Sequence, residues 1–228
     1  MKVTPLQRTS LKDRVAQFIR DAILSGKLES GDRIVELKLA KDLGIGTTAV
    51  REALFELESL GFVTRIISKG TFVTRLTAED VAQIFEVRQQ LEGLAVDLVR
   101  KRLTDADVAL LQKHADEMKA AALENDAQRF YRSDLEFHRA IWRLSGNRYL
   151  ARSLDLLVVP LFTFFIMKRR RLQGGDLLAS VERHLDVVRA LREGGNARQC
   201  LRTSIQFFSA QEDRLLFQQA GAQSADQR

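Results

Sequence analysis

Residues 39–74 read LAKDLGIGTTAVREALFELESLGFVTRIISKGTFVT, and this stretch decides the fold of the first third of the chain. Its apolar residues recur at helical spacing in two short segments, which end at Gly44 and at Gly61. The second helix begins near Thr47 or Thr48, and either side chain is suited to cap it. Two helices joined by a tight turn that contains glycine form a helix-turn-helix unit.

Two β-prone runs follow the second helix. Residues 62–67 and 71–74 are rich in branched and aromatic side chains, and residues 68–70 separate them. This pattern predicts a β-hairpin, which would form the wing of a winged helix. Upstream, Ser10 begins a capping box, and apolar residues then recur at helical spacing as far as Gly26, so one more amphipathic helix is predicted.

The remainder of the chain predicts a separate helical bundle. Capping signals of the type Thr-x-x-Asp begin at Thr77 and at Thr104. Helices are predicted over residues 78–102, 105–124, 126–144, 147–172 with a kink or break near Pro160, 176–193 and 197–219. The predicted fold class is mainly α, with a winged helix-turn-helix and small β-hairpin over residues 1–76 and an all-α bundle over residues 77–228.

Positive charge is concentrated in the first part. The chain carries a formal charge of +6, and residues 1–76 hold 13 Lys and Arg against 9 Asp and Glu, so a polyanion is the favoured partner. The single cysteine, Cys200, excludes an internal disulfide and indicates a reducing cytoplasm. The apolar run 154–167 is too short to span a bilayer and contains Pro160, so no membrane partner is expected.

Shape and charge together favour DNA binding by the winged helix. If the recognition helix begins at Thr47 and Thr48, these two residues lie nearest the base edges of the major groove. Arg51, one turn further along, is then within reach of a guanine or a phosphate. Lys69 and Gly70 at the hairpin tip suit close approach to phosphates or to the minor groove. The alternative is a protein–protein module. Arg51 would then pair with a nearby carboxylate, that of Glu52, Glu56 or Glu58.

Four segments carry a resemblance to a known family. They are SGDRIVE (30–36), LGIGTTAVREAL (43–54), ESLGFV (58–63) and GTFV (70–73). In this order and spacing they resemble the winged helix-turn-helix of GntR-type bacterial transcription regulators. The predicted DNA-binding residues are Arg33, Thr47, Thr48, Arg51, Lys69 and Gly70, and of these Arg51, with its neighbour Glu52, matches the family pattern. The chain departs from the pattern at Thr47, where family members often have an arginine that reaches DNA.

One constellation in the bundle could hold a metal ion. Asp134 and His138 are four residues apart on a predicted helix and share one face, and His184 lies on a later helix that could fold back against it. A carboxylate and two imidazoles suit zinc or nickel, with manganese and iron also open. The alternative is that Asp134 pairs on the surface with Arg132 or Arg139 and that the histidines are ordinary helix residues.

The bundle also resembles a known domain. DLEFH (134–138), SGN (145–147) and SVERH (180–184) are similar to the C-terminal FCD effector domain of the FadR branch of the GntR family. The resemblance implies that Asp134, His138 and His184 fill three of the four positions of a metal site that helps to bind a small carboxylate effector. The fourth position falls on Gln206, whose amide is a poorer ligand than imidazole.

Arg88 fits the first helix of the same domain. It would either clamp an effector carboxylate or form an intrahelical pair with Glu92 at i+4. Together these features predict a cytoplasmic, homodimeric, ligand-responsive transcription regulator, most commonly a repressor in this family, that binds a palindromic double-stranded operator and a small organic acid. It would not be an enzyme. The alternatives are a metal-dependent hydrolase and an architectural DNA binder without an effector.

Overall fold

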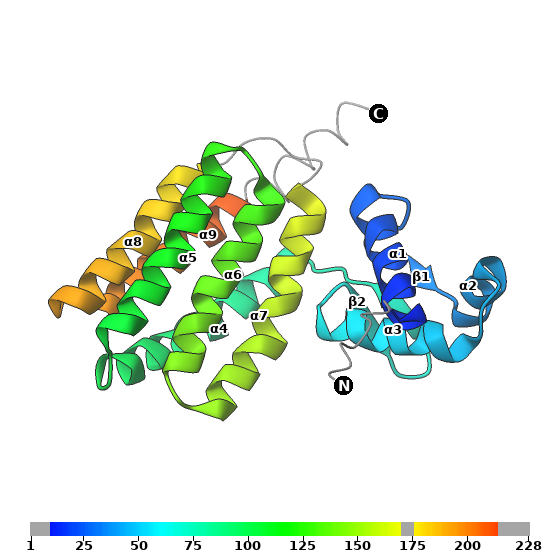
Figure 1. Ribbon diagram of the computed structural model, residues 1–228, viewed down its shortest axis with the longest axis horizontal. Helices are drawn as coiled ribbons and strands as arrows, with labels where there is room; N and C mark the ends of the chain where they lie inside the picture. Colours follow the sequence, from blue (N-terminus) through cyan, green and yellow to red (C-terminus); the bar gives the residue numbers. More distant parts are fainter. Residues whose placement is uncertain (1–9, 170–175, 214–228) are drawn as a thin grey trace, which may run out of the picture. The chain divides into compact units, whose positions relative to one another are not determined.

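The computed structural model describes residues 10–169 and 176–213 of the chain. The chain separates into two compact units between Arg75 and Leu76, one residue before the predicted boundary. Figure 1 shows the small sheet among the helices of the first unit, and the long helices that make up the second. The prediction of a mainly helical protein with one small antiparallel sheet is confirmed.

The first unit is a winged helix. Its elements are α1 (Leu11–Ser25), β1 (Arg33–Ile34), α2 (Glu36–Leu43), α3 (Thr47–Ser59), β2 (Val63–Ile66) and β3 (Gly70–Val73). Helix α1 packs on α3 because both carry apolar residues at helical spacing. The buried members of this core are Val15, Ala16, Ile19 and Ile23 on α1, and Val50, Ala53, Leu54 and Leu57 on α3.

Two details of this unit differ from the prediction. The N-cap of α3 is Gly46, which makes no side-chain cap hydrogen bond, so neither Thr47 nor Thr48 caps the helix. Strand β1 was not predicted, because two residues are too short to show an alternating pattern. Its pairing of Arg33 with Phe72 makes the hairpin a three-stranded antiparallel sheet of order β1-β3-β2.

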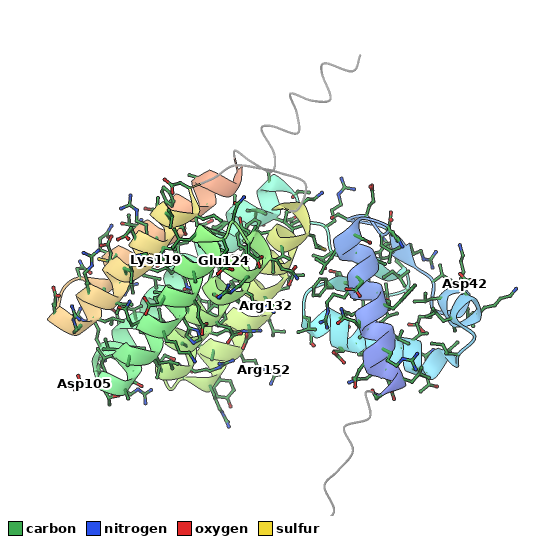
Figure 2. All side chains as sticks on the ribbon, turned by 45° about the horizontal axis from the view of Figure 1, so that its top comes forward. Asp42, Asp105, Lys119, Glu124, Arg132 and Arg152 are labelled. Carbon is green, nitrogen blue, oxygen red and sulfur yellow. The ribbon has the colours of Figure 1, made fainter. Side chains whose placement is uncertain are left out.

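The second unit is a bundle of helices. Its elements are α4 (Ala78–Arg100), α5 (Asp105–Leu123), α6 (Ala127–Leu144), α7 (Arg148–Arg169), α8 (Leu177–Glu193) and α9 (Ala197–Asp213). The predicted capping boxes at Thr77 and Thr104 are both formed, as is the one at Ser10 in the first unit. Charged side chains such as those of Lys119, Arg132 and Arg152 lie on the outside of the bundle (Figure 2).

A kink or break was predicted near Pro160, and helix α7 continues through this residue, so the break is not formed. A proline inside a helix removes one backbone hydrogen bond and usually kinks or breaks it. Buried residues on both sides of the proline, including Val159 and Leu161, pack in a bundle core where α7 lies against α4 and α6. Over Arg148–Lys168 the helix is long and apolar enough to cross a membrane, but half of the most apolar window is buried inside the bundle. The apolar segment of α7 is therefore longer than the run 154–167 identified from the sequence.

Candidate functional site

The predicted DNA-binding residues lie at the start of α3 and on the sheet beside it. Thr48 and Arg51 are exposed, and Thr47 is half-buried. Lys69 is exposed in the turn between β2 and β3. Arg33, on β1, is exposed as well, and the new strand brings it against this turn.

Gly70 is a position that needs glycine. Its φ of +111° lies in the region that L side chains rarely adopt. A Cβ added there would lie 3.4 Å from Arg33 Nε, so the guanidinium group packs directly against the glycine backbone. The structure therefore brings Arg33 of the edge strand β1 against Gly70, where the central strand β3 begins.

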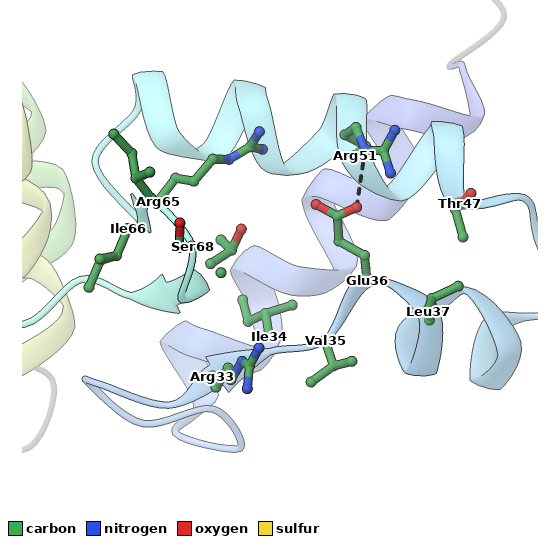
Figure 3. A pocket seen from close by; sticks show the side chains of 13 residues that line it. Arg33, Ile34, Val35, Glu36, Leu37, Thr47, Arg51, Arg65, Ile66 and Ser68 are labelled. Carbon is green, nitrogen blue, oxygen red and sulfur yellow. Dashed lines mark hydrogen bonds and ion pairs between the residues drawn. The ribbon is translucent and has the colours of Figure 1, made fainter.

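Arg51 pairs with an unforeseen partner. Its Nε lies 3.1 Å from Glu36 Oε2, on the first residue of α2, and Figure 3 shows this pair across the groove between α3 and β1. The three carboxylates considered from the sequence are not its partners. Glu56 pairs with Lys12 and Arg20, Glu58 pairs with Arg65, and no ion pair is recorded for Glu52 among the described residues. Glu36 thus lies beside three basic residues that line the same groove, Arg33, Arg51 and Arg65.

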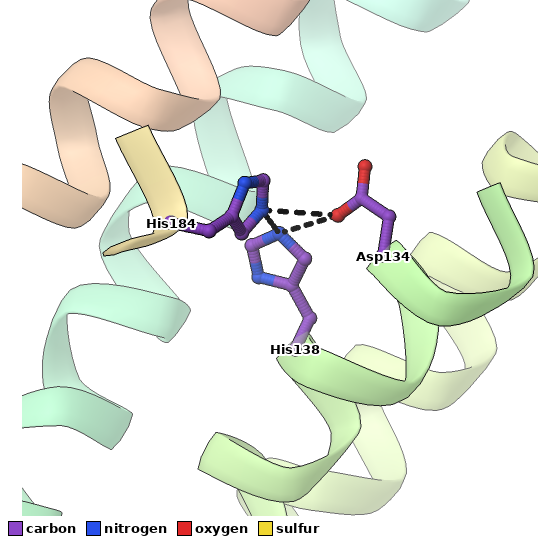
Figure 4. Close-up of side chains that lie close together, drawn as sticks. All are labelled: Asp134, His138 and His184. Carbon is purple, nitrogen blue, oxygen red and sulfur yellow. Dashed lines mark hydrogen bonds and ion pairs between the residues drawn. The ribbon is translucent and has the colours of Figure 1, made fainter. Parts of the chain in front are cut away.

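Asp134, His138 and His184 come together in the interior of the bundle. Asp134 and His138 project from one face of α6, and His184 approaches them from α8 (Figure 4). Asp134 Oδ1 lies 3.1 Å from His184 Nε2 and 3.3 Å from His138 Nε2, and the two Nε2 atoms are 3.4 Å apart. All three residues are at most 2% exposed, so this cluster, hereafter the triad, is shielded from water.

The surface alternative for Asp134 does not hold. Arg132 is exposed on the outside of α6, whereas Asp134 is buried. Arg139 forms ion pairs with Glu136 and Asp155 at 2.8 Å each. Neither arginine is therefore a partner of the buried carboxylate.

The geometry of the triad fits a divalent cation. Four ligands placed tetrahedrally at about 2.0–2.1 Å from zinc are separated from one another by about 3.3 Å. The three ligand atoms of the triad have mutual distances of 3.1–3.4 Å. Asp134 Oδ1 is buried and accepts no hydrogen bond from the described residues. One carboxylate oxygen and two imidazole nitrogens therefore converge on one point.

The tautomers of both histidines favour metal binding. His184 Nδ1 donates to the Ser180 carbonyl oxygen at 2.7 Å, and His138 Nδ1 donates to Glu92 Oε2 at 2.5 Å. When the Nδ1 atom of a neutral imidazole carries the hydrogen, the Nε2 atom has a free lone pair. In the neutral form of both rings, the Nε2 lone pairs are therefore available to a cation beside Asp134. Outer hydrogen bonds of this kind are typical of histidines that ligate metals.

Glu92 also belongs to the site. From the sequence it was predicted only as a possible i+4 partner of Arg88. Its Oε1 accepts from Arg88 Nε at 2.5 Å while its Oε2 accepts from His138, and both Arg88 and Glu92 are buried. Burial opposes the charge on Glu92, but the adjacent Arg88 and His138 outweigh it and lower its pKa to about 2. Glu92 is therefore an ionised carboxylate that joins α4 to α6.

Burial and neighbouring charges also act in opposite directions on the pKa values of two members of the triad, Asp134 and His138. Burial opposes the charge on Asp134, but the nearby His184 and His138 outweigh burial and hold its pKa well below the usual range. Burial also opposes a charge on His138, yet Glu92 and Asp134 raise its pKa despite the opposing Arg88. The carboxylates of Glu92 and Asp134 therefore favour a positive charge on His138, and a metal ion bound at Nε2 would take the place of the proton there.

Arg88 has one nitrogen without a partner. The Nη1 atom is buried and makes no hydrogen bond within the part of the chain that the structure describes. The guanidinium carbon lies 5.1 Å from the centre of the Phe162 ring and 5.6 Å from that of Phe85. A buried N–H group without an acceptor is costly, so this position favours an added oxygen atom. The intrahelical pair with Glu92 and a free donor coexist in one side chain.

Gln206 does not join the triad. Helix α9 turns Leu201, Ser204, Ile205 and Phe208 into the bundle, whereas the side chain of Gln206 is exposed. The family spacing from His184 leads to position 206, but the helical period of α9 places the Gln206 side chain on the outer face. The inward polar residue near this point of α9 is Ser204.

Both units match known domains. Residues 11–73 match the family described as bacterial regulatory proteins, gntR family, and residues 83–206 match the FCD domain. A winged helix with an exposed basic face, joined to a helical domain with a buried polar site, defines the class of DNA-binding transcription regulators. The chain belongs to the GntR family of such regulators, in its FadR-like FCD branch, and its relatives are regulators and not enzymes.

Named relatives cover most of the chain. It is 31% identical over 83% of its length to 82% of the probable D-xylose utilization operon transcriptional repressor of Paenarthrobacter nicotinovorans. It is 31% identical over 79% of its length to 74% of the gluconate operon transcriptional repressor of Bacillus licheniformis. Among solved structures, McbR/YncC of E. coli has a TM-score of 0.71 at 25% identity, covering 93% of this chain and 100% of that one. The hydrolase alternative finds no support in these relatives.

Proposed function

We propose that this regulator is a homodimeric repressor that releases or tightens its operator when a small carboxylate binds in the helical domain. The observation that carries the proposal is the buried Arg88, whose Nη1 donor lacks a partner beside a cluster suited to a cation. The repressor assignment follows the printed names of two relatives. A cytoplasmic location accords with binding to a bacterial operator.

The DNA-binding half of the proposal rests on the exposed face of the winged helix. Thr47, Thr48 and Arg51 would enter the major groove, and Arg33, Lys69 and Gly70 would lie against the backbone or the minor groove. One recognition helix reads few base pairs. Two copies related by a twofold axis would read a palindrome, which is the reason to expect a dimer.

The effector half rests on the interior of the bundle. Asp134, His138 and His184 would hold one divalent ion, with zinc or nickel best suited to two imidazoles and a carboxylate. Such an ion supplies a positive charge to which an oxygen of the effector can bind. Arg88 would donate through its free Nη1 to another oxygen of the same carboxylate. Gln206 is no part of this proposed site, because its side chain is exposed.

The two halves would communicate by a population shift. A ligand changes operator affinity only to the extent that it binds the DNA-competent and the DNA-incompetent arrangement differently. The relevant states are two placements of the winged helices in the dimer. The proposed effector site belongs to the second unit and the proposed DNA-binding face to the first, so the ligand would act through the arrangement of the two units.

One experiment tests the whole proposal. Duplexes retained by the purified chain from a random-sequence pool are sequenced, with and without zinc and a panel of small carboxylates. We expect a palindromic sequence whose recovery changes with at least one carboxylate. Retention unaffected by every carboxylate, together with no thermal stabilisation by any of them, would leave a DNA binder without an effector. Absence of a retained palindrome would contradict the dimeric operator complex.

A further inference from the structure

Glu92 connects the two groups that the proposed function assigns to different parts of the effector. One oxygen of its carboxylate accepts from Arg88 Nε, and the other accepts from His138 Nδ1. Arg88, Glu92 and His138 are each at most 2% exposed, so water does not screen these contacts. A continuous chain of charge-assisted hydrogen bonds therefore runs from the guanidinium group through the carboxylate to the imidazole.

The two hydrogen bonds draw on the same carboxylate charge. When the Nε2 atom of His138 binds a cation, its Nδ1–H becomes a stronger donor and attracts Glu92 more strongly. The bond from Glu92 to Arg88 then weakens, which frees the guanidinium group for another anion. Conversely, an anion that neutralises Arg88 leaves more of the Glu92 charge for His138, so His138 becomes a better ligand.

We infer that Glu92 is a positioning residue that couples metal binding at the triad to carboxylate binding at Arg88, so that each ligand strengthens the other. The inference rests on the proposed function, since it requires a metal on His138. Linkage makes the coupling reciprocal: any factor by which an anion at Arg88 raises metal affinity is the factor by which the metal raises anion affinity. It also predicts that removing the charge of Arg88 changes metal affinity even when no effector is present.

The test is a set of zinc affinities measured by chelator competition on the full chain. Glu92→Gln should weaken zinc binding about 10- to 100-fold, as is usual for removal of an outer hydrogen-bond partner of a metal-bound histidine. Arg88→Gln should strengthen zinc binding by about five-fold or more, because it mimics neutralisation by a carboxylate. General damage to the bundle would weaken binding in both variants, so the opposite signs separate positioning from mere destabilisation.

Two controls isolate the route through Glu92. Arg139→Gln removes the same charge from a residue next to His138 that pairs with Glu136 and Asp155, so it should change zinc affinity less than two-fold. In the Glu92→Gln background, Arg88→Gln should have no further effect, because the connecting carboxylate is gone. If Glu92→Gln does not fold, the ¹⁵N spectrum of the histidines serves instead. The Nδ1–H signal of His138 should then move in Arg88→Gln and stay in Arg139→Gln.

The outcomes distinguish this inference from the proposed function. If zinc binds the parent but Arg88→Gln leaves its affinity unchanged or weakens it, the coupling is wrong and the metal site stands. An equal effect of Arg88→Gln with and without Glu92 would show that charge acts through space and would also overturn the role of Glu92. If neither zinc nor nickel binds the parent, the metal assignment fails, and the coupling fails with it.

Discussion

The molecule contains two Arg–Glu pairs whose surroundings differ. Arg51 and Glu36 lie 3.1 Å apart on the face proposed to bind DNA, with side chains 57% and 26% exposed. Arg88 and Glu92 lie 2.5 Å apart in the bundle, with side chains 1% and 0% exposed. An exposed pair is weak and easily exchanged, whereas a buried pair is costly to break. The same two side-chain types therefore form a solvated pair in one unit and a pair shielded from water in the other.

Breaking the buried pair should have the largest effect. Glu92→Gln leaves the Arg88 charge in the interior without its counter-charge, so we expect the free energy of unfolding to fall by about 3–5 kcal/mol. Urea denaturation followed by circular dichroism measures this loss. Glu86→Gln, an exposed position on the same helix, is the control and should change stability by less than about 0.5 kcal/mol. A loss below 1 kcal/mol for Glu92→Gln would mean that the pair is not buried as described.

Removing a member of the triad should abolish tight metal binding. His184→Ala deletes one of three converging ligand atoms, so we expect metal affinity to fall more than about 100-fold, beyond the loss typical of outer partners. Elemental analysis after dialysis against zinc measures the content. Gln206→Ala should retain the metal of the parent, because Gln206 is exposed. Equal content in parent and His184→Ala would place the ion elsewhere.

Removing the arginine of the exposed pair should act on DNA and not on folding. Arg51→Ala should weaken binding to the selected operator by about 1–3 kcal/mol, the range for one arginine that reads a guanine. Fluorescence anisotropy on a labelled duplex gives the affinity. Helicity and oligomeric state should match the parent, because Arg51 is exposed. Undiminished operator binding would show that α3 does not read the groove as proposed.

Removing the acid of the exposed pair should have the smallest effect on stability. Glu36→Gln should change the free energy of unfolding by less than about 1 kcal/mol, since the pair is solvated. It also deletes a negative charge that repels phosphates, so binding to a scrambled duplex should tighten. Asp42→Asn removes the same charge from an exposed position on the same helix and serves as the control. If both variants bind the scrambled duplex more tightly by the same factor, Glu36 acts only as one of the negative charges on α2, and its pair with Arg51 has no special role.

The sequence contained enough to predict the helices and the triad. Capping boxes such as those at Ser10 and Thr104 are local, and the i, i+4 spacing of Asp134 and His138 fixes their common face. Such local signals depend only on residues close in the sequence, so the folded chain retains the structure that they predict. They also set the helix boundaries to within a few residues over the described part of the chain.

The features that the sequence did not predict depend on contacts between residues that are far apart in the sequence. Strand β1 exists because β3 offers it a pairing edge, and the partner of Arg51 comes from another helix. The role of Glu92 requires knowing that α4 and α6 are adjacent, since the i+4 pair with Arg88 alone indicates an ordinary helix contact. Gln206 could be excluded only once the face of α9 was known.

The salt dependence of DNA binding tests the central claim most directly. The claim is that an exposed basic face on the first unit binds duplex DNA and leaves the buried site free to regulate that binding. The operator recovered from the pool is titrated with the parent chain at increasing potassium chloride concentrations. The account predicts that the logarithm of affinity falls linearly and steeply with the logarithm of salt, by about 0.9 per neutralised phosphate. No salt-dependent binding to any recovered duplex would contradict it.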